Sequence, residues 1–169
     1  MKVRLGRRGD YAVRAMLSIA REPADRRRKT RQITEEMDIP QRYATQILAS
    51  LVRGGLLTAV AGPDGGYSLA RPAAEISVLD VVEIAEGAIA LDECVLRGGP
   101  CDWEGGCPVH ATWTEAQQAF TSRLAATSFA DLAELDSKIE SGAHVWPGGP
   151  PHGSVVPRRG IREEGEDRE

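Results

Sequence analysis

The sequence has no run of eighteen apolar residues, and its N-terminal stretch, MKVRLGRRGD, has no apolar core. A membrane-spanning helix needs about twenty apolar residues in succession, and a signal peptide needs a shorter apolar segment, so neither is expected. We therefore expect a cytoplasmic protein without a membrane partner. Its 169 residues suit one domain of ordinary size with an appendage.

The residue patterns of an enzyme are also absent from the sequence. No nucleophile and base pair, cofactor fingerprint or cluster of acidic residues stands out along the chain. The glycine-rich segment GPDGG has neither the lysine nor the following helix of a phosphate-binding loop, so it is interpreted as a hairpin turn. We expect a binding protein and not an enzyme.

Charge is divided unevenly along the chain. Residues 1–71 carry fourteen Lys and Arg against seven Asp and Glu, a net charge of +7, whereas residues 72–169 carry seven against eighteen, a net charge of −11. A basic half of this kind is typical of a nucleic-acid-binding module, because its side chains neutralise phosphates.

The basic half has the pattern of a small helical module. Helices are predicted over Tyr11–Arg21 and Gln32–Met37, and a third follows Pro40 and ends at Gly54. Strands are predicted over Leu56–Val60 and Tyr67–Ala70, joined by the turn AGPDGG. Three helices and a hairpin in this order predict a winged helix-turn-helix.

The third helix has one apolar face, formed by Ala44, Ile47, Leu48 and Leu51, and one polar face. A helix in the major groove must present polar side chains to base edges and phosphates, which this polar face can do. We expect double-stranded DNA to be contacted by this face, by basic residues near the first two helices and by the wing glycines: Arg7, Arg8, Arg28, Arg31, Gln41, Arg42, Thr45, Gln46, Gly65 and Gly66.

Cysteine is scarce, and its three copies lie within fourteen residues at Cys94, Cys101 and Cys107, with His110 three positions later. Three thiolates and an imidazole are enough donors to bind zinc or iron, and the glycines and prolines between them favour a loop that can surround a metal. Zinc is the stronger of two alternatives to an iron site, although neither gap matches the short spacing of structural zinc cysteines. Simple burial of the cysteines is a second alternative.

Three further helices are expected around this loop. The first runs from Ser77, as N-cap, to Glu86, and the last runs from Ser128 to Lys138. Between them, a long helix carries an apolar stripe that faces either the core of the protomer or the same helix of a second copy: Val109, Trp113, Ala116, Phe120 and Leu124.

The fold class expected is therefore mainly α with a small β-hairpin wing. Residues 1–72 form the DNA-binding module, residues 73–141 form the cysteine loop and dimerisation helices, and residues 142–169 have the Pro, Gly and charge content of a disordered tail.

The order of these parts resembles a known family. The segments GDYAVRAM, PQRYATQILASLVRGGLL, AGPDGGYSLARP and ISVLDVVEIAEG, followed by the three cysteines, are similar to winged-helix iron–sulfur regulators such as IscR and NsrR. The resemblance implies a homodimeric transcription factor that binds a palindromic operator. It also implies an iron–sulfur cluster on Cys94, Cys101 and Cys107 that responds to redox state, nitric oxide or cluster supply.

Members of this family differ in their fourth cluster ligand, and the chain has a match to each kind. His110 matches the histidine of IscR-like proteins, and Asp10 matches the aspartate of NsrR-like proteins. We prefer His110, which by resemblance implies a [2Fe-2S] cluster, with Asp10 and a [4Fe-4S] cluster as the alternative. The alternative function is a DNA-binding protein without a cluster, stabilised by zinc or sensing oxidants through its thiols.

The chain departs from the family pattern in its wing. Many relatives carry an arginine just before the wing glycine, where it can enter the minor groove, but this chain has Ala61. Base selection is therefore expected to depend more on Arg42, Thr45 and Gln46.

Overall fold

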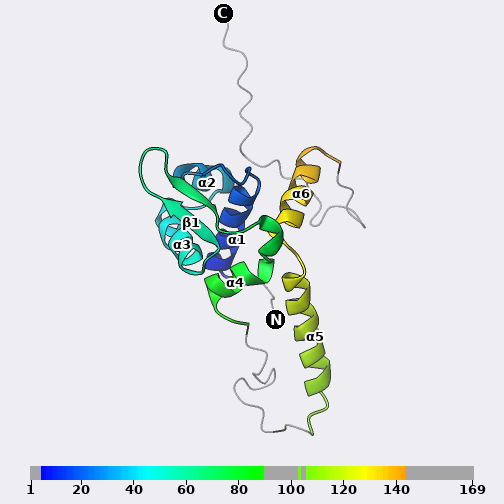
Figure 1. The fold of residues 1–169 in the computed structure, drawn as a ribbon. Coiled ribbons are helices and arrows are strands. Elements are labelled where there is room, and N and C mark those ends of the chain that lie inside the picture. Colours follow the sequence, from blue (N-terminus) through cyan, green and yellow to red (C-terminus); the bar gives the residue numbers. More distant parts are fainter. Residues whose placement is uncertain (1–4, 90–102, 104–105, 144–169) are drawn as a thin grey trace, which may run out of the picture.

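The computed structural model describes residues 5–89, 103 and 106–143. Along these residues the elements are α1 (Arg7–Ala20), α2 (Thr30–Met37), α3 (Gln41–Arg53), β1 (Leu57–Val60), β2 (Gly66–Leu69), the 3-10 helix η1 (Ala73–Glu75), α4 (Val78–Glu86), α5 (His110–Ala125) and α6 (Phe129–Glu140). Figure 1 shows α1 to α4 and the hairpin gathered into one body, with α5 extending away from it. The mainly α fold with a two-stranded wing confirms the predicted fold class.

Helix α1 begins at Arg7, one turn before the predicted start at Tyr11. The backbone N–H of Gly9 donates to Oε1 of Glu86 at 2.7 Å. N–H groups in the first turn have no partner inside a helix, and a carboxylate there is also favoured by the helix dipole. The predicted start was wrong because this partner lies 77 residues further along the chain.

Helices α1, α2 and α3 pack together, and only a short turn separates α2 from α3. Helix α2 ends at Asp38, whose φ of 51° is left-handed, and Pro40 then precedes α3. The predicted buried face of α3 is confirmed, since its buried residues are Ala44, Ile47, Leu48 and Leu51. This face packs into a core with Met16 and Ile33, which are fully buried on α1 and α2.

The wing is an antiparallel hairpin in which Leu57 pairs with Leu69 and Val60 with Gly66. Tyr67 also exchanges two backbone hydrogen bonds of 2.9 Å with Arg28, so the loop before α2 adds a short bridge to the wing. Gly66 has a φ of 148°, and a Cβ there would lie 2.7 Å from the Arg28 carbonyl oxygen. Glycine is needed at this position because the Arg28 backbone passes so close to it.

Helices α4 and α6 start with the same cap. The Oγ of Ser77 accepts the Asp80 N–H at 3.1 Å, and the Oγ of Ser128 accepts the Asp131 N–H at 3.1 Å. In each case the aspartate accepts the N–H of its serine, which completes a capping box. The predicted caps at Ser77 and Ser128 are confirmed.

One hydrophobic core crosses the predicted domain boundary at residue 72. Ile76, Val81 and Phe129 are buried together with residues of α1, α2 and α3. Phe129 is fully buried at the start of α6, and its N–H donates to the Ile76 carbonyl at 2.9 Å. Helices α4 and α6 therefore pack directly on the DNA-binding module. The predicted disordered tail lies, from residue 144 onward, outside the described residues.

Helix α5 contrasts with every other α-helix, because none of its sixteen residues is buried. Its N-terminal end lies far from the body, and its C-terminal end approaches the body beside α4 and the start of α6 (Figure 1). No helix in the described part of the chain is long and apolar enough to span a membrane.

Candidate functional site

The polar face of α3 is open to solvent. Gln41, Arg42, Thr45 and Gln46 are all exposed, while the opposite face of the same helix is buried. The first turns of a helix-turn-helix recognition helix are the part that reaches base edges. These four side chains lie in the first turns of α3, and their contact with DNA stays a prediction.

An aromatic pair lies beneath one of these side chains. The guanidinium carbon of Arg42 lies 4.8 Å from the centre of the Tyr43 ring, and the Tyr43 ring lies 5.6 Å from that of Tyr11 on α1. Sequence reasoning missed this arrangement, because Tyr11 and Tyr43 come together only when α1 packs on α3.

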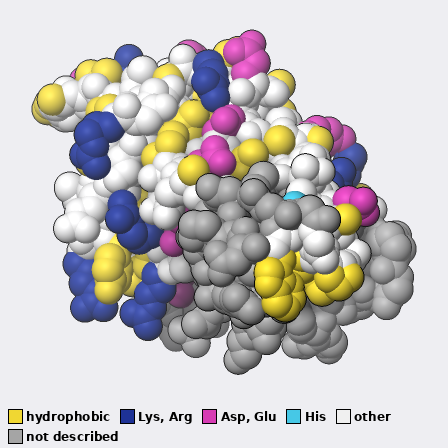
Figure 2. Space-filling model, turned by 90° about the horizontal axis from the view of Figure 1, so that it is seen from below, with side chains coloured by type: hydrophobic (Ala, Val, Ile, Leu, Met, Phe, Trp, Pro, Cys, Tyr) yellow, Lys and Arg dark blue, Asp and Glu magenta, His cyan; other side chains and the backbone are white. Residues whose placement is uncertain are grey.

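Basic side chains extend the exposed surface beyond α3. Arg7 and Arg8 are exposed in the first turn of α1, and Arg8 lines a shallow depression with Ile47 and Ser50 of α3. Lys and Arg side chains gather on the side of the molecule that carries α3 and the wing (Figure 2).

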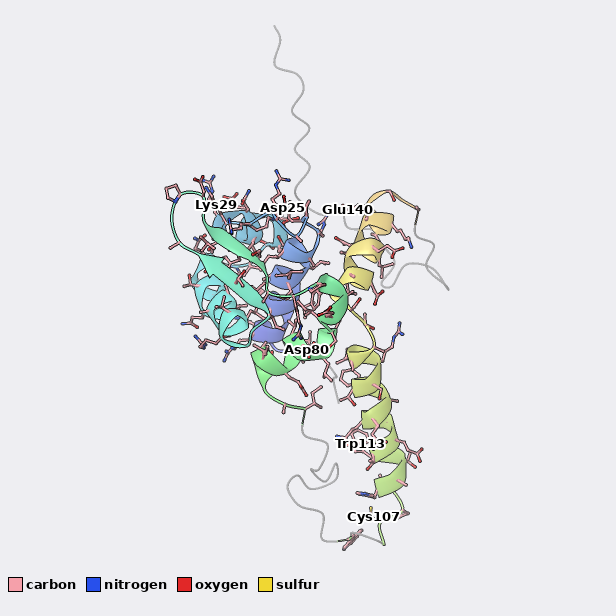
Figure 3. The ribbon with its side chains drawn as sticks, in the orientation of Figure 1. Asp25, Lys29, Asp80, Cys107, Trp113 and Glu140 are labelled. Atoms are coloured by element: carbon pink, nitrogen blue, oxygen red, sulfur yellow. The ribbon has the colours of Figure 1, made fainter. Side chains whose placement is uncertain are left out.

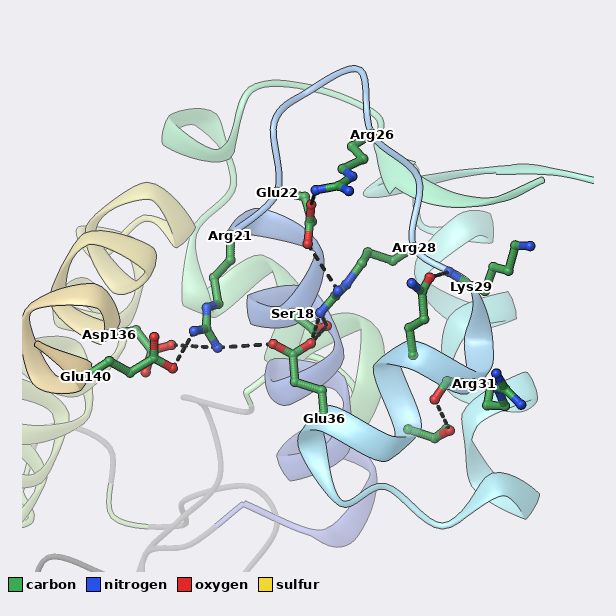
Figure 4. Close-up of polar contacts among 12 residues, drawn as sticks. Ser18, Arg21, Glu22, Arg26, Arg28, Lys29, Arg31, Glu36, Asp136 and Glu140 are labelled. Carbon is green, nitrogen blue, oxygen red and sulfur yellow. Dashed lines mark hydrogen bonds and ion pairs between the residues drawn. The ribbon is translucent and has the colours of Figure 1, made fainter. Parts of the chain in front are cut away.

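The two arginines predicted near α2 are placed differently. Arg31 is exposed and forms a 3.7 Å ion pair with Glu35. Arg28 is only 17% exposed, and it pairs with Glu22 at 3.1 Å and with Glu36, which also accepts the Ser18 hydroxyl. The Arg28 side chain forms its ion pairs within the protomer, where it links the end of α1 to α2 (Figure 4). It is therefore much less accessible to DNA than the exposed Arg31.

The same network reaches α6 through Arg21. The Arg21 guanidinium pairs with Glu36 of α2 at 3.2 Å, with Asp136 of α6 at 3.2 Å, and with Glu140. Asp136 is buried, and it meets Arg21 at the contact of α1 with α6 (Figure 4). The Arg21 guanidinium therefore links α1 to both α2 and α6.

Gly65 and Gly66 lie at wing positions where the backbone leaves no room for a side chain. Gly65 is buried, and a Cβ there would lie 2.1 Å from the Val60 carbonyl oxygen. Together with the close approach of Arg28 to Gly66, this makes both glycines necessary for the turn, whatever they contact outside the protomer. Ala61 is exposed and directly follows β1.

Two of the four preferred metal ligands are described, and they lie one turn apart. Cys107 is half-buried, His110 is the exposed first residue of α5, and the His110 N–H donates to the Cys107 carbonyl at 3.3 Å. Cys94 and Cys101 lie outside the described residues. Within the described part of the chain no three His, Cys, Asp or Glu side chains are grouped for metal binding. A thiol and an imidazole three residues apart supply donor types that iron and zinc both accept.

Asp10, the alternative ligand, lies apart from this pair within one protomer, and by the family resemblance it would have to reach the cysteine loop of a second protomer. It lies in the first turn of α1, whereas Cys107 lies near the end of α5 that is remote from α1 (Figure 3). Its carboxylate pairs with Arg14 at 3.0 Å, and Arg14 also donates to the Met37 carbonyl at 3.3 Å. Sequence reasoning did not single out Arg14, although the spacing of four residues from Asp10 was visible.

The predicted apolar stripe lies on an unburied helix. Phe120 is 44% exposed and Val109 is 38% exposed, Ala116 is exposed, and Trp113 and Leu124 are half-buried. Hydrophobic side chains also reach the surface on the half of the molecule that carries α5 (Figure 2). Of the two alternatives, the protomer core is not where this stripe packs, because α5 contributes no buried residue to it.

Comparison with known proteins identifies the family. The Rrf2 family, described as iron-dependent transcriptional regulators, matches residues 5–135. The chain belongs to the Rrf2 family. It is 32% identical over 138 residues to the HTH-type transcriptional regulator IscR of Photorhabdus laumondii, a match that covers 82% of this chain and 84% of that protein. It is 30% identical to IscR of Xenorhabdus nematophila over the same length, with the same shares covered.

Solved structures share the fold of this Rrf2 protein. CymR of Staphylococcus aureus has 28% identity and a TM-score of 0.60, covering 76% of this chain and 97% of that one. IscR of T. potens has 24% identity and a TM-score of 0.63, covering 88% and 96%. The chain is thus a DNA-binding transcriptional regulator of the Rrf2/IscR type.

Proposed function

We propose that the protein is a homodimeric regulator whose binding to a palindromic operator is controlled by an iron–sulfur cluster. The observation that carries this proposal is the placement of Cys107 and His110 at the start of α5, which carries an exposed apolar stripe, in an Rrf2 chain. The protein acts in the cytoplasm, where thiols stay reduced and able to bind metal.

The DNA contacts are assigned to α3, the start of α1 and the wing. Gln41, Arg42, Thr45 and Gln46 face the major groove, and Arg7, Arg8 and Arg31 contact phosphates. Gly65 and Gly66 let the wing backbone approach the duplex. Arg28 acts indirectly, since its side chain holds the loop between α1 and α2.

The dimer is assigned to the stripe on α5. A soluble protein rarely leaves large apolar side chains such as Phe120 and Val109 together at its surface unless a partner covers them. A second copy is the natural partner, because a two-fold dimer places two recognition helices on the two half-sites of a palindrome, about 34 Å apart.

The cluster is assigned to Cys94, Cys101, Cys107 and His110, and we favour the [2Fe-2S] form. A bound cluster would supply iron that reacts with oxidants or nitric oxide. Glu86 connects the cysteine segment to DNA binding, because it accepts the Gly9 N–H of α1 and lies just before the chain enters that segment. A change in this segment can therefore reach the helix that carries Arg7 and Arg8.

The first experiment is purification without oxygen. The protein should be brown and contain iron and acid-labile sulfide, because thiolate-to-iron charge transfer absorbs visible light. Cys94→Ala, Cys101→Ala and Cys107→Ala should each abolish or destabilise this absorption while circular dichroism retains the helical signal. A colourless protein that keeps stoichiometric zinc after reconstitution with iron and sulfide contradicts the proposal.

The fourth ligand is tested by two variants in the same spectra. His110→Ala should change the visible spectrum and Asp10→Ala should not, because His110 is tied to Cys107 by one turn of backbone and Asp10 is already paired with Arg14. The reverse result assigns Asp10, which by the family resemblance favours a [4Fe-4S] cluster. Two unchanged spectra exclude both residues.

Thiol sensing without a cluster is the second candidate function. Cys107 is half-buried, and a solved structure of Staphylococcus aureus CymR, 26% identical to this chain, is described as its oxidised form. In this case the metal-free protein should lose or gain operator affinity on mild oxidation, and a thiol reductant should restore it.

A further inference from the structure

The exposed face of α3 has one side chain that the protomer itself already orients. Arg42 is exposed, and its guanidinium carbon lies 4.8 Å from the centre of the Tyr43 ring. A guanidinium within about 6 Å of an aromatic centroid is attracted by the negative face of the ring. Gln41, Thr45 and Gln46 are not long cations, so Arg42 is the member of this face that gains from such a contact.

The ring under Arg42 is held by two helices. Tyr43 is half-buried against the hydrophobic core, and its N–H donates to the Pro40 carbonyl at 2.9 Å. Its ring centre lies 5.6 Å from that of Tyr11 with an angle of 34° between the planes. Tyr11 belongs to α1 and also packs against the core, so the ring pair sets the position of the Arg42 guanidinium relative to both α1 and α3.

We propose that Tyr43, supported by Tyr11, is a positioning residue that orders Arg42 for its contact with operator DNA. An arginine with several free rotatable bonds loses conformational freedom when it binds. A guanidinium already resting on a fixed ring loses less, which strengthens binding without any contact between Tyr43 and DNA. The inference depends on the proposed role of α3 as the DNA-reading helix.

The experiment is a double-mutant cycle on DNA binding. The probe is a duplex selected from a random pool by the wild-type protein, and the variants are Tyr43→Leu, Arg42→Ala and the two combined. Leucine keeps an apolar side chain in the core but removes the aromatic face. Tyr43→Leu should raise the Kd by about 2- to 5-fold per half-site, the range expected for an exposed cation–π contact. In the Arg42→Ala background it should raise the Kd by much less.

Two controls separate positioning from a general structural role. Tyr43→Phe keeps the ring face and should leave the Kd within about 2-fold of wild type. Tyr67→Leu removes another half-buried tyrosine, which lies in the wing, and its effect should be the same with Arg42 or with Ala at position 42. Thermal unfolding of every variant reports any loss of stability independently of DNA binding.

The outcomes distinguish this inference from the proposed function. If Tyr43→Leu weakens binding equally in both backgrounds, the ring is a core residue only and the positioning role is wrong. If Arg42→Ala leaves the Kd unchanged while Gln46→Ala raises it, α3 still reads DNA but Arg42 does not. If the wild-type protein selects no sequence from the pool in either its metal-loaded or its metal-free form, the DNA-reading role itself fails.

Discussion

Helices α3 and α5 both carry apolar side chains at helical spacing, but these side chains differ in how far the protomer buries them. The apolar face of α3 is buried in the core and its polar face is exposed, whereas α5 keeps its apolar stripe at the surface. Burial of apolar area is the main favourable term in folding, so α3 is stabilised by its own protomer. Helix α5 gains less of this stabilisation within the protomer, because none of its residues is buried.

The largest expected effect comes from comparing a core residue of α3 with an exposed residue of α5. Leu48→Ala on α3 should destabilise the protein by about 2–5 kcal/mol, because a fully buried leucine leaves a cavity when truncated. The loss should not depend on protein concentration. For Phe120→Ala on α5 the loss should be small at protein concentrations well below the dimer dissociation constant and should grow to a plateau as concentration rises, because it acts through association. Chemical denaturation at several concentrations measures both, and equal concentration dependence would remove the distinction between the two helices.

The dimer assignment is tested by placing a charge in the stripe. Trp113→Glu and Phe120→Glu should raise the dimer dissociation constant by about 100-fold or more, because burial of an unpaired carboxylate in an interface is strongly unfavourable. Gln118→Glu, at an exposed position on the same helix, is the matched control and should leave the dimer intact. Analytical ultracentrifugation of the three variants measures their dimer dissociation constants. A stable Phe120→Glu dimer would place the interface elsewhere.

The exposed face of α3 is tested by comparing base reading with phosphate binding. Gln46→Ala should cost about 1–3 kcal/mol on the selected sequence and little on random DNA, as expected for a side chain that bonds a base edge. Arg31→Ala should weaken binding to every sequence alike and reduce the salt dependence. Titrations at two salt concentrations separate these effects. If neither variant changes binding, the assigned DNA contacts are wrong.

The smallest effect concerns the cap that joins α5 to α6. Hydrogen bonds from the Ser128 hydroxyl and backbone N–H lower the pKa of Asp131, and Arg123 adds a weaker attraction. Because the folded pKa lies below the unfolded value, this stabilisation is complete above the unfolded pKa and is lost as pH falls through the folded pKa. Ser128→Ala should move the Asp131 pKa upward, and Ser128→Thr, which retains a hydroxyl, should not. Carboxyl carbon NMR titration detects the difference.

Much of the fold could be predicted from the sequence because its signals are local. The spacing of Ala44, Ile47, Leu48 and Leu51 predicts the buried face of α3, and Ser77 and Ser128 predict the starts of α4 and α6 within a residue. Three cysteines and a histidine so close in sequence predict a metal site, since a short loop keeps its donors together.

What the tertiary structure alone decided depends on contacts between distant segments. The start of α1 is set by Glu86, 77 residues from Gly9, and the Arg28 charge is taken up by Glu22 and Glu36. The ring of Tyr11 reaches Tyr43 only across the contact of α1 with α3. Periodicity identified an apolar stripe on α5 but not its destination, because a helix pattern records which face is apolar and not which surface will cover it. Only the folded protomer, in which no residue of α5 is buried, shows that this stripe is not part of the core.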